Sequence, residues 1–237
     1  MTLRRIRRVV TTRDGGVSVP PYASFNLGAH VGDRAEAVTA NRERLATGIG
    51  LPTDRLVWMN QVHGCAVAAV DGPRSQPVPA TDAVVTAEPG LAVVVLVADC
   101  VPVLLADPVV GVVGAVHAGR RGASTGVLLA ALAMMRRLGA RLEQVEALLG
   151  PSACGQCYEV PADMQAEVSA QLPGSACQTR QGTAGLDLRA GLWRQLADAG
   201  VARVGVDPRC TVEDPALYSY RRDGVTGRIA ALTWRET

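Results

Sequence analysis

The chain has 237 residues, with 24 basic and 22 acidic side chains and a formal net charge of +2. This near balance, without a basic stripe interleaved with aromatic residues, argues against nucleic acid as a partner. Its hydrophobic content of 48% is ample for a large core, and we expect one domain spanning residues 1–237. All 24 of these basic residues are arginine, and the chain contains no lysine. This excludes a P-loop and Schiff-base chemistry, because both need a lysine side chain.

The chain begins with charged residues but lacks the apolar segment of a secretory signal. Its longest apolar run, 91–106, is interrupted by Asp99 and Pro102, which argues against a membrane span. We therefore expect a cytoplasmic protein that acts as a monomer or small homo-oligomer. In that compartment its cysteines would be reduced.

The N-terminal third predicts loops followed by one helix. Residues 13–30 are rich in turn formers and predict loops around short strands. Asp33 and Glu36 have the spacing of a capping box, with aspartate replacing serine or threonine. They predict a helix that ends near Ala46.

The rest of the chain alternates between strand-rich and helical segments. Hydrophobic strands interspersed with amphipathic helices predict a mixed α/β (α+β) fold, with helices packed on mixed sheets. Run 91–98 is almost continuously apolar, which indicates a strand buried on both faces. The expected strand regions are 55–71, 83–118, 202–206 and 228–234, and the expected helices are 124–138, 162–172 and 187–199.

Two β-rich runs flank Asp107 and Pro108, whose turn chemistry predicts a hairpin. A hairpin centred just after Pro108 would place Cys100 directly opposite His117, with Cβ atoms about 4.5–5.5 Å apart. A one-residue change of register would instead put them on opposite faces. Pro102 indicates an edge or a bulge in the first strand.

Two of the three histidines lie in short polar breaks beside glycine, His63 in Gln61–Gly64 and His117 before Ala118-Gly119. Together with Cys100 they supply two imidazoles and one thiolate. That set suits a zinc ion with one coordination position free for water or substrate. A single copper ion with Met59 as axial ligand is an alternative, whereas three histidines are too few for a multicopper centre.

Cys154-Gly-Gln-Cys157 has the CxxC spacing of a redox centre or of half a structural zinc site. No second CxxC follows it. The sequence leaves both interpretations open, together with a purely structural one.

Arginines cluster near the expected metal ligands. Arg120 and Arg121 lie just before the expected 124–138 helix, whose N-terminal N–H groups and dipole attract anions. Guanidinium groups would add bidentate contacts to a phosphate. Arg221 and Arg222 form a second basic patch near the C-terminus. The alternative for both clusters is a set of solvent-facing charges.

Motifs over about residues 9–234 closely resemble the YfiH family, also called the peptidoglycan-editing-factor or laccase-domain family. They are Thr12–Ser18, Ser24–Gly28, His30–Asp33, Asn41-Arg42, Gln61–Gly64, Thr81–Ala83, Ala98–Leu105, His117–Gly119, Gly150-Pro151, Cys157–Val160 and Tyr220–Arg222. The resemblance implies a four-layer α/β/β/α sandwich and a zinc ion bound by His63, Cys100 and His117. One departure is Arg120, which stands where the family commonly has tryptophan.

The resemblance also implies purine nucleoside chemistry. The expected reactions are phosphorolysis of adenosine, inosine, guanosine and methylthioadenosine, and deamination of adenosine, with a link to editing of peptidoglycan precursors. Asp99 and Asp82 are candidates to move the proton in deamination, although strand alternation would turn Asp99 away from the metal. The residues expected to bind phosphate, sugar or base are Asn26, Arg42, Gln61, Arg120, Arg121 and Arg221.

Three alternatives belong to other functional classes. Cys100 could be a nucleophile with His117 as its base, which would make a metal-independent cysteine amidase. The trio could hold one copper ion and oxidise phenols. Finally, the zinc could be structural and the protein an interaction module.

Overall fold

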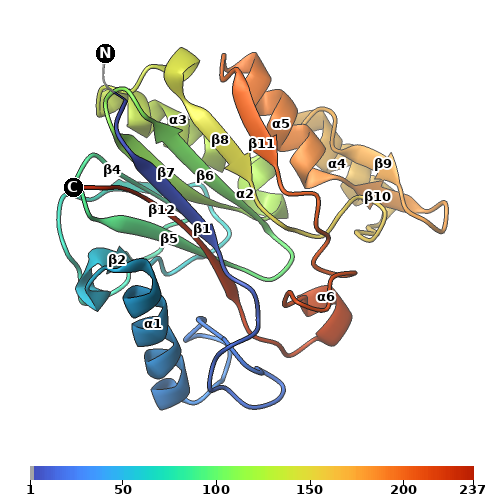
Figure 1. Cartoon of the computed structure of the whole chain (residues 1–237). Helices are drawn as coiled ribbons and strands as arrows, with labels where there is room; N and C mark the ends of the chain where they lie inside the picture. Colours follow the sequence, from blue (N-terminus) through green and yellow to red (C-terminus); the bar gives the residue numbers. More distant parts are fainter. Residues whose placement is uncertain (1–2) are drawn as a thin grey trace.

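The computed structural model describes residues 3–237, so the first two residues of the expected domain lie outside it. The extent of that single domain stays a prediction. The fold is the expected α+β type: two large sheets pack face to face, with helices on both outer sides (Figure 1). Within residues 3–237, no helix combines the length and apolar character needed to cross a bilayer.

One large sheet has six strands and the other has four. The six-stranded sheet runs in the order β11 (Arg203–Val206), β8 (Glu146–Leu149), β6 (Val101–Asp107), β7 (Val112–Ala118), β4 (Ala83–Thr86) and β3 (Val67–Ala69). The four-stranded sheet runs in the order β1 (Ile6–Val10), β12 (Ile229–Arg235), β5 (Ala92–Val97) and β2 (Leu56–Val57). A small separate hairpin pairs β9 (Ala176–Gln178) with β10 (Ala184–Leu186).

The helices divide between the two outer faces. Helix α1 covers the four-stranded sheet, and α2 to α5 lie on the side of the six-stranded sheet (Figure 1). Their bounds are α1 Ala35–Ile49, α2 Arg120–Ser124, α3 Val127–Arg137, α4 Ala162–Gln171, α5 Leu188–Asp198 and α6 Tyr220–Asp223. Short 3₁₀ turns occupy Thr53–Arg55 and Leu142–Gln144.

Side-chain alternation along β5 explains the four layers. Val93 and Val95 face the other sheet, whereas Val94 and Leu96 join the core beneath α1. Successive side chains of a strand point to opposite faces, so a strand buried on both faces must be apolar throughout. All six residues of β5 are buried, as the sequence pattern predicted.

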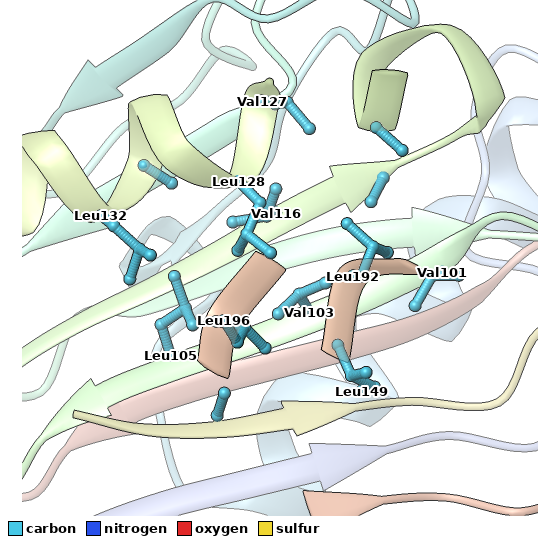
Figure 2. Packing of buried hydrophobic residues seen from close by; sticks show 14 of the residues in the cluster. Val101, Val103, Leu105, Val116, Val127, Leu128, Leu132, Leu149, Leu192 and Leu196 are labelled. Carbon is cyan, nitrogen blue, oxygen red and sulfur yellow. The ribbon is translucent and has the colours of Figure 1, made fainter. Parts of the chain in front are cut away.

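The third core lies between the six-stranded sheet and its helices. Leu128 and Leu132 of α3 and Leu192 of α5 pack on apolar side chains of β6 and β7, including Val103 and Val116 (Figure 2). Burying each such side chain contributes about 1.5–3 kcal/mol. This packing makes the paired strands β6 and β7 a rigid platform for the residues at their ends.

The hairpin of β6 and β7 exists, but its predicted register was wrong. His117 pairs with Pro102, and Cys100 lies just before the strand. The turn is longer than expected because Gly111, with a φ of 87°, follows Val110 and donates its N–H to Asp107 O. His117 therefore pairs with Pro102, two residues beyond the expected partner Cys100. A shift of two residues leaves each side chain on the expected face of the sheet.

Two helix predictions need correction. Asp33 does not cap α1: its carboxylate accepts hydrogen bonds from Ser18 and Asn26 instead, and α1 continues to Ile49. The expected 124–138 helix is divided into α2 and α3 by Gly126, whose φ of 89° is left-handed. Asp187 does cap α5 and accepts the N–H of Ala190.

Candidate metal centre and pocket

A cavity of about 600 Å³ opens where the ends of β5 and β7 meet the start of β6. That volume is within the range of small-molecule sites. His63, Cys100 and His117 all line it, although they come from three separate stretches of the chain. Each of the three offers one ligand atom, and these atoms lie within 4.8 Å of one another.

The geometry of the trio fits a tetrahedral zinc ion. Cys100 Sγ lies 3.9 Å from His63 Nε2. Bonds of about 2.0–2.3 Å place two ligands of one zinc ion about 3.3–3.8 Å apart, close to the separation observed. The His63 and His117 rings meet edge to face, with centroids 4.7 Å apart. The donor set thus supports the predicted three-ligand site without a large rearrangement.

Asp82 is fully buried and holds two of the three ligands in place. Its Oδ1 lies 2.8 Å from His117 Nδ1, which leaves Nε2 of His117 available as a ligand. The same carboxylate accepts the backbone N–H groups of Val62, His63 and Gly64 at 2.7–3.2 Å. These bonds hold His63 in a left-handed conformation, with a φ of 59°, that is uncommon for a residue other than glycine. Asp82 therefore positions both histidines of the candidate metal site.

The trio is electrostatically coupled. Burial opposes ionisation of Cys100, but the charge and hydrogen bonds of His117 and His63 outweigh it and lower the pKa of the thiol to about 6. Burial also disfavours charge on His117, yet the Cys100 thiolate and Asp82 raise its pKa to about 9. A thiolate is the form of cysteine that binds metals and that attacks electrophiles. Both chemistries are therefore open to Cys100.

The remaining pocket wall is cationic and aromatic. Arg120, Arg221 and Arg228 line the cavity, and Arg221 stacks on the Tyr158 ring with its Cζ 4.8 Å from the centroid. Over residues 3–237, Asp99 is the one carboxylate that lines this cavity. The excess of guanidinium groups suits an anionic ligand.

Three of the six expected substrate-binding residues do line the pocket: Gln61, Arg120 and Arg221. The amide of Gln61 exchanges two hydrogen bonds of 2.8 Å with the backbone of Leu96. Gln61 therefore shapes the wall and ties its own loop to the end of β5. Arg120 is the first residue of α2 rather than part of a loop before a longer helix.

The structure does not bring Asn26, Arg42 and Arg121 to the pocket. Asn26 is fully buried, where its amide bonds with Gly28, Asp33 and Arg228. The Arg42 guanidinium donates to Leu27 O and lies 4.0 Å over the ring of Trp58. Arg121 is exposed on α2, outside the cavity lining. Their positions do not support the expected contacts with a substrate bound in this cavity.

Asp99 lines the pocket, but both of its carboxylate oxygens are already bonded. Oδ1 accepts from Thr211 Oγ1 at 2.6 Å, and Oδ2 accepts the backbone N–H of Arg221 at 2.7 Å. Its own backbone has a φ of 87°. These bonds fasten the start of α6, and with it Arg221, to the residue beside Cys100. They support a positioning role, and the expected proton-carrying role stays a prediction.

The model of a family described as multi-copper polyphenol oxidoreductase laccase matches residues 7–236. The chain belongs to this family. Its solved relatives include the YfiH protein of Bacillus licheniformis, with a TM-score of 0.91 and 30% identity over 98% of this chain and 93% of that one. YlmD of Geobacillus stearothermophilus has a TM-score of 0.92 and 33% identity over 98% and 92% of the two chains. The resemblance to the YfiH family, and the fold that it implied, are thus confirmed.

Curated relatives of this YfiH-family chain carry an enzyme name. A protein of Mycobacterium tuberculosis named purine nucleoside phosphorylase is 59% identical over 98% of this chain and 93% of its own length. One of Corynebacterium glutamicum with the same name is 54% identical over 98% and 95% of the two chains. The similarity runs through nearly the whole of each protein, so it includes the pocket.

Sequence reasoning gave no role to four residues that line the pocket: His30, Tyr158, Tyr220 and Arg228. Three of them fall within motifs shared with the YfiH family, which was the available indication. Partial desolvation by the pocket wall and the neighbouring Arg228 guanidinium lower the pKa of His30, which favours its neutral form. Tyr158 and Tyr220 give the pocket aromatic surface beside Arg120.

Proposed function

We propose that the protein is a zinc-dependent purine nucleoside phosphorylase that acts on adenosine, inosine, guanosine and methylthioadenosine, and that it also deaminates adenosine. The observation that carries this proposal is the convergence of His63, Cys100 and His117 in a cavity lined by arginines and tyrosines. The purine nucleoside phosphorylase name of its relatives supports the substrate class.

His63, Cys100 and His117 would hold the zinc ion, with Asp82 fixing both imidazole ligands. When bound, such an ion supplies a Lewis acid, and three protein ligands leave its fourth position for water or substrate. Three histidines are too few for the multicopper centre that the family description names. A single copper ion is the weaker choice because Met59, its expected axial ligand, packs in the core between the sheets and does not line the cavity.

The pocket's own side chains would bind and orient the two substrates. Arg120 and Arg221 would hold the phosphate that attacks C1′ and neutralise its charge as the bond to the base breaks. Neither of these guanidinium groups forms an ion pair within residues 3–237, so both remain available. Tyr158 and Tyr220 would offer ring faces to the purine. In deamination, the neutral imidazole of His30 can both accept and donate a proton.

The test is incubation with adenosine and phosphate, followed by chromatography of the products. Adenine with ribose 1-phosphate reports phosphorolysis, inosine reports deamination, and hypoxanthine reports both in sequence. Cys100→Ala should abolish turnover, whereas Cys65→Ala, at an exposed cysteine outside the pocket, should leave it unchanged. Absence of all three products with the zinc-loaded protein would refute the proposal.

The arrangement of Asp82, His117 and Cys100 also favours a second candidate function, that of a metal-independent cysteine amidase acting on peptidoglycan precursors. A lowered thiol pKa beside an imidazole oriented by a carboxylate is the arrangement of a cysteine nucleophile. The position of His63 Nε2, 3.9 Å from the sulfur, favours metal binding instead. Chelator treatment separates the two candidates. Amide hydrolysis by the cysteine nucleophile should continue after zinc removal, whereas phosphorolysis and deamination of nucleosides should stop.

A further inference from the structure

A second group of metal-binding side chains lies outside the pocket lining: Cys154, Cys157, Cys210 and Glu213. One ligand atom of each lies within 4.8 Å of the others. Three sulfurs and one carboxylate oxygen are a complete ligand set for a tetrahedral zinc ion. From this arrangement we propose a second, structural zinc site formed by these four residues, independent of the first.

Two turns of the same backbone form supply the ligands in pairs. Cys154 O accepts the N–H groups of Cys157 and Tyr158 at 2.9 and 3.0 Å. Cys210 O likewise accepts those of Glu213 and Asp214 at 3.1 and 2.8 Å. Each turn brings its first and fourth side chains together, so a CxxC pair meets a CxxE pair. The sequence shows no second CxxC because glutamate completes the second pair.

The two turns are fastened to each other by the backbone. Ser152 and Cys210 form a parallel β-bridge, and the Thr211 N–H donates to Ser152 O at 3.1 Å. The Cys154 N–H points at Cys210 Sγ from 3.4 Å. Such N–H groups stabilise sulfur that carries negative charge, and outer bonds of this kind orient metal ligands. The ligand pairs are therefore preorganised although they are more than fifty residues apart in the chain.

The surroundings suit a structural site in which protein side chains fill all four coordination positions and the ion enters from the surface. Cys210 is buried and the other two cysteines are half-buried, whereas Glu213 lies at the surface. Arg180 pairs with Glu213 through Oε1, which leaves the second carboxylate oxygen for a cation. The guanidinium also offsets the negative charge of three thiolates and one carboxylate around a divalent ion. Four protein ligands leave no position for substrate, which distinguishes this site from the first.

The second site would stabilise one wall of the pocket. Tyr158, which follows Cys157, lines the cavity and stacks on Arg221. Thr211, which follows Cys210, donates to Asp99. An ion that joins the two turns would fix the positions of Tyr158 and Thr211 relative to each other without touching the substrate. Its loss should weaken substrate binding while zinc at the first site remains.

Zinc counting tests the proposal with the full chain purified under reducing conditions and loaded with zinc. The wild type should bind about two zinc ions per chain, and Cys157→Ser should lose about one of them. Cys100→Ala should lose the other, and the double variant should bind none. Cys177→Ser is the matched control because this half-buried thiol lies near the turn at Gly155 but outside the group of four. Its zinc content should equal that of the wild type.

Cobalt gives a readout that is independent of activity and of the first site. In a Cys100→Ala background, Co²⁺ should produce a strong thiolate charge-transfer band, because three sulfurs remain to bind it. Glu213→Gln, a mild change at an exposed position, should keep that band and weaken cobalt affinity about 10-fold or more. The proposal is overturned if the Cys100→Ala protein binds no zinc or cobalt. It also fails if the reduced, zinc-exposed protein carries a Cys154–Cys157 or Cys154–Cys210 disulfide, seen as a loss of two hydrogens by intact mass.

Discussion

Asp82 Oδ1 lies 2.8 Å from His117 Nδ1, and the same carboxylate accepts the backbone N–H of His63 at 2.9 Å. One fully buried side chain therefore fixes the ring of one proposed zinc ligand and the backbone of another. His63 belongs to an irregular loop and His117 to β7, and their meeting depends on this carboxylate.

Asp82→Asn should weaken zinc binding at the first site by about 10–100-fold, the usual cost of removing an outer partner of a metal ligand. The amide keeps the shape of the side chain but loses the charge that holds His117 and the three N–H groups. Competition with a chromophoric chelator measures the affinity. Asp71→Asn, at an exposed position in a loop, is the control and should bind zinc as the wild type does. Equal affinities of the two variants would show that Asp82 does not position the ligands.

Adjacent arginines on α2 give a matched pair for the phosphate contact. Arg120 lines the pocket, whereas Arg121 is exposed and lies outside it. A hydrogen bond to a charged group contributes about 1.5–3 kcal/mol, so Arg120→Ala should raise the KM for phosphate by about 10–100-fold. Arg121→Ala should leave that KM within about twofold. Steady-state kinetics at saturating nucleoside measures both, and similar effects of the two substitutions would contradict the assignment.

The sequence predicted those pocket residues whose role follows from side-chain chemistry better than those whose role follows from tertiary packing. Donor chemistry alone was enough to propose His63, Cys100 and His117 as metal ligands, and the structure brings their donor atoms within 4.8 Å of one another. The hairpin register was predicted wrongly, but His117 and Cys100 still lie on the same face. The longer turn, which includes Gly111, shifts each pairing by two residues, and a shift of two residues does not change the face on which a side chain lies. A shift by one residue would have separated them.

The arginines were harder to place because the same side chain serves surface, core and site. Nothing in the sequence shows that Arg42 lies on Trp58, or that Arg228, near the start of β12, reaches the pocket. Both facts depend on tertiary packing of segments far apart in the chain. The proposed second metal site shows the same limit, since Cys154 and Cys157 meet Cys210 only in the folded chain, beside the isolated bridge between Ser152 and Cys210.

Asp99→Asn distinguishes a proton carrier from a positioning residue. Asparagine tolerates the left-handed backbone at this position, where φ is 87°. Its oxygen can still accept the Arg221 N–H, and its NH2 group can donate to the Thr211 hydroxyl, so both contacts can persist in a weaker form without the charge. We expect a rise in the KM for phosphate of about 3–10-fold, in line with one weakened hydrogen bond. The kcat for deamination and its pH profile should be unchanged. A loss of kcat of about 100-fold or more, the usual contribution of a general acid or base, would restore the proton-carrying role.

Gly119→Ala should impair the metal site while leaving the fold intact. The φ of −72° at Gly119 suits any residue, so the backbone itself imposes no strain. An added Cβ, however, would lie 2.9 Å from His63 Cδ2 and 3.1 Å from Cys100 Sγ. Both atoms belong to ligand side chains, and such overpacking costs about 1–3 kcal/mol. Zinc affinity at the first site should fall by about 5–150-fold, the same free energy expressed as an equilibrium constant.

The control is Gly48→Ala, at an exposed position within α1 where an added Cβ meets no atom within 4 Å. This substitution should stabilise the protein by about 0.5–1 kcal/mol, because alanine loses less backbone entropy than glycine in a helix. Denaturant unfolding of the metal-free proteins reports stability separately from zinc affinity. If Gly119→Ala bound zinc as tightly as Gly48→Ala, then His63 and Cys100 could move apart without cost. The three ligands would in that case not be held rigidly enough to form a site before the metal arrives.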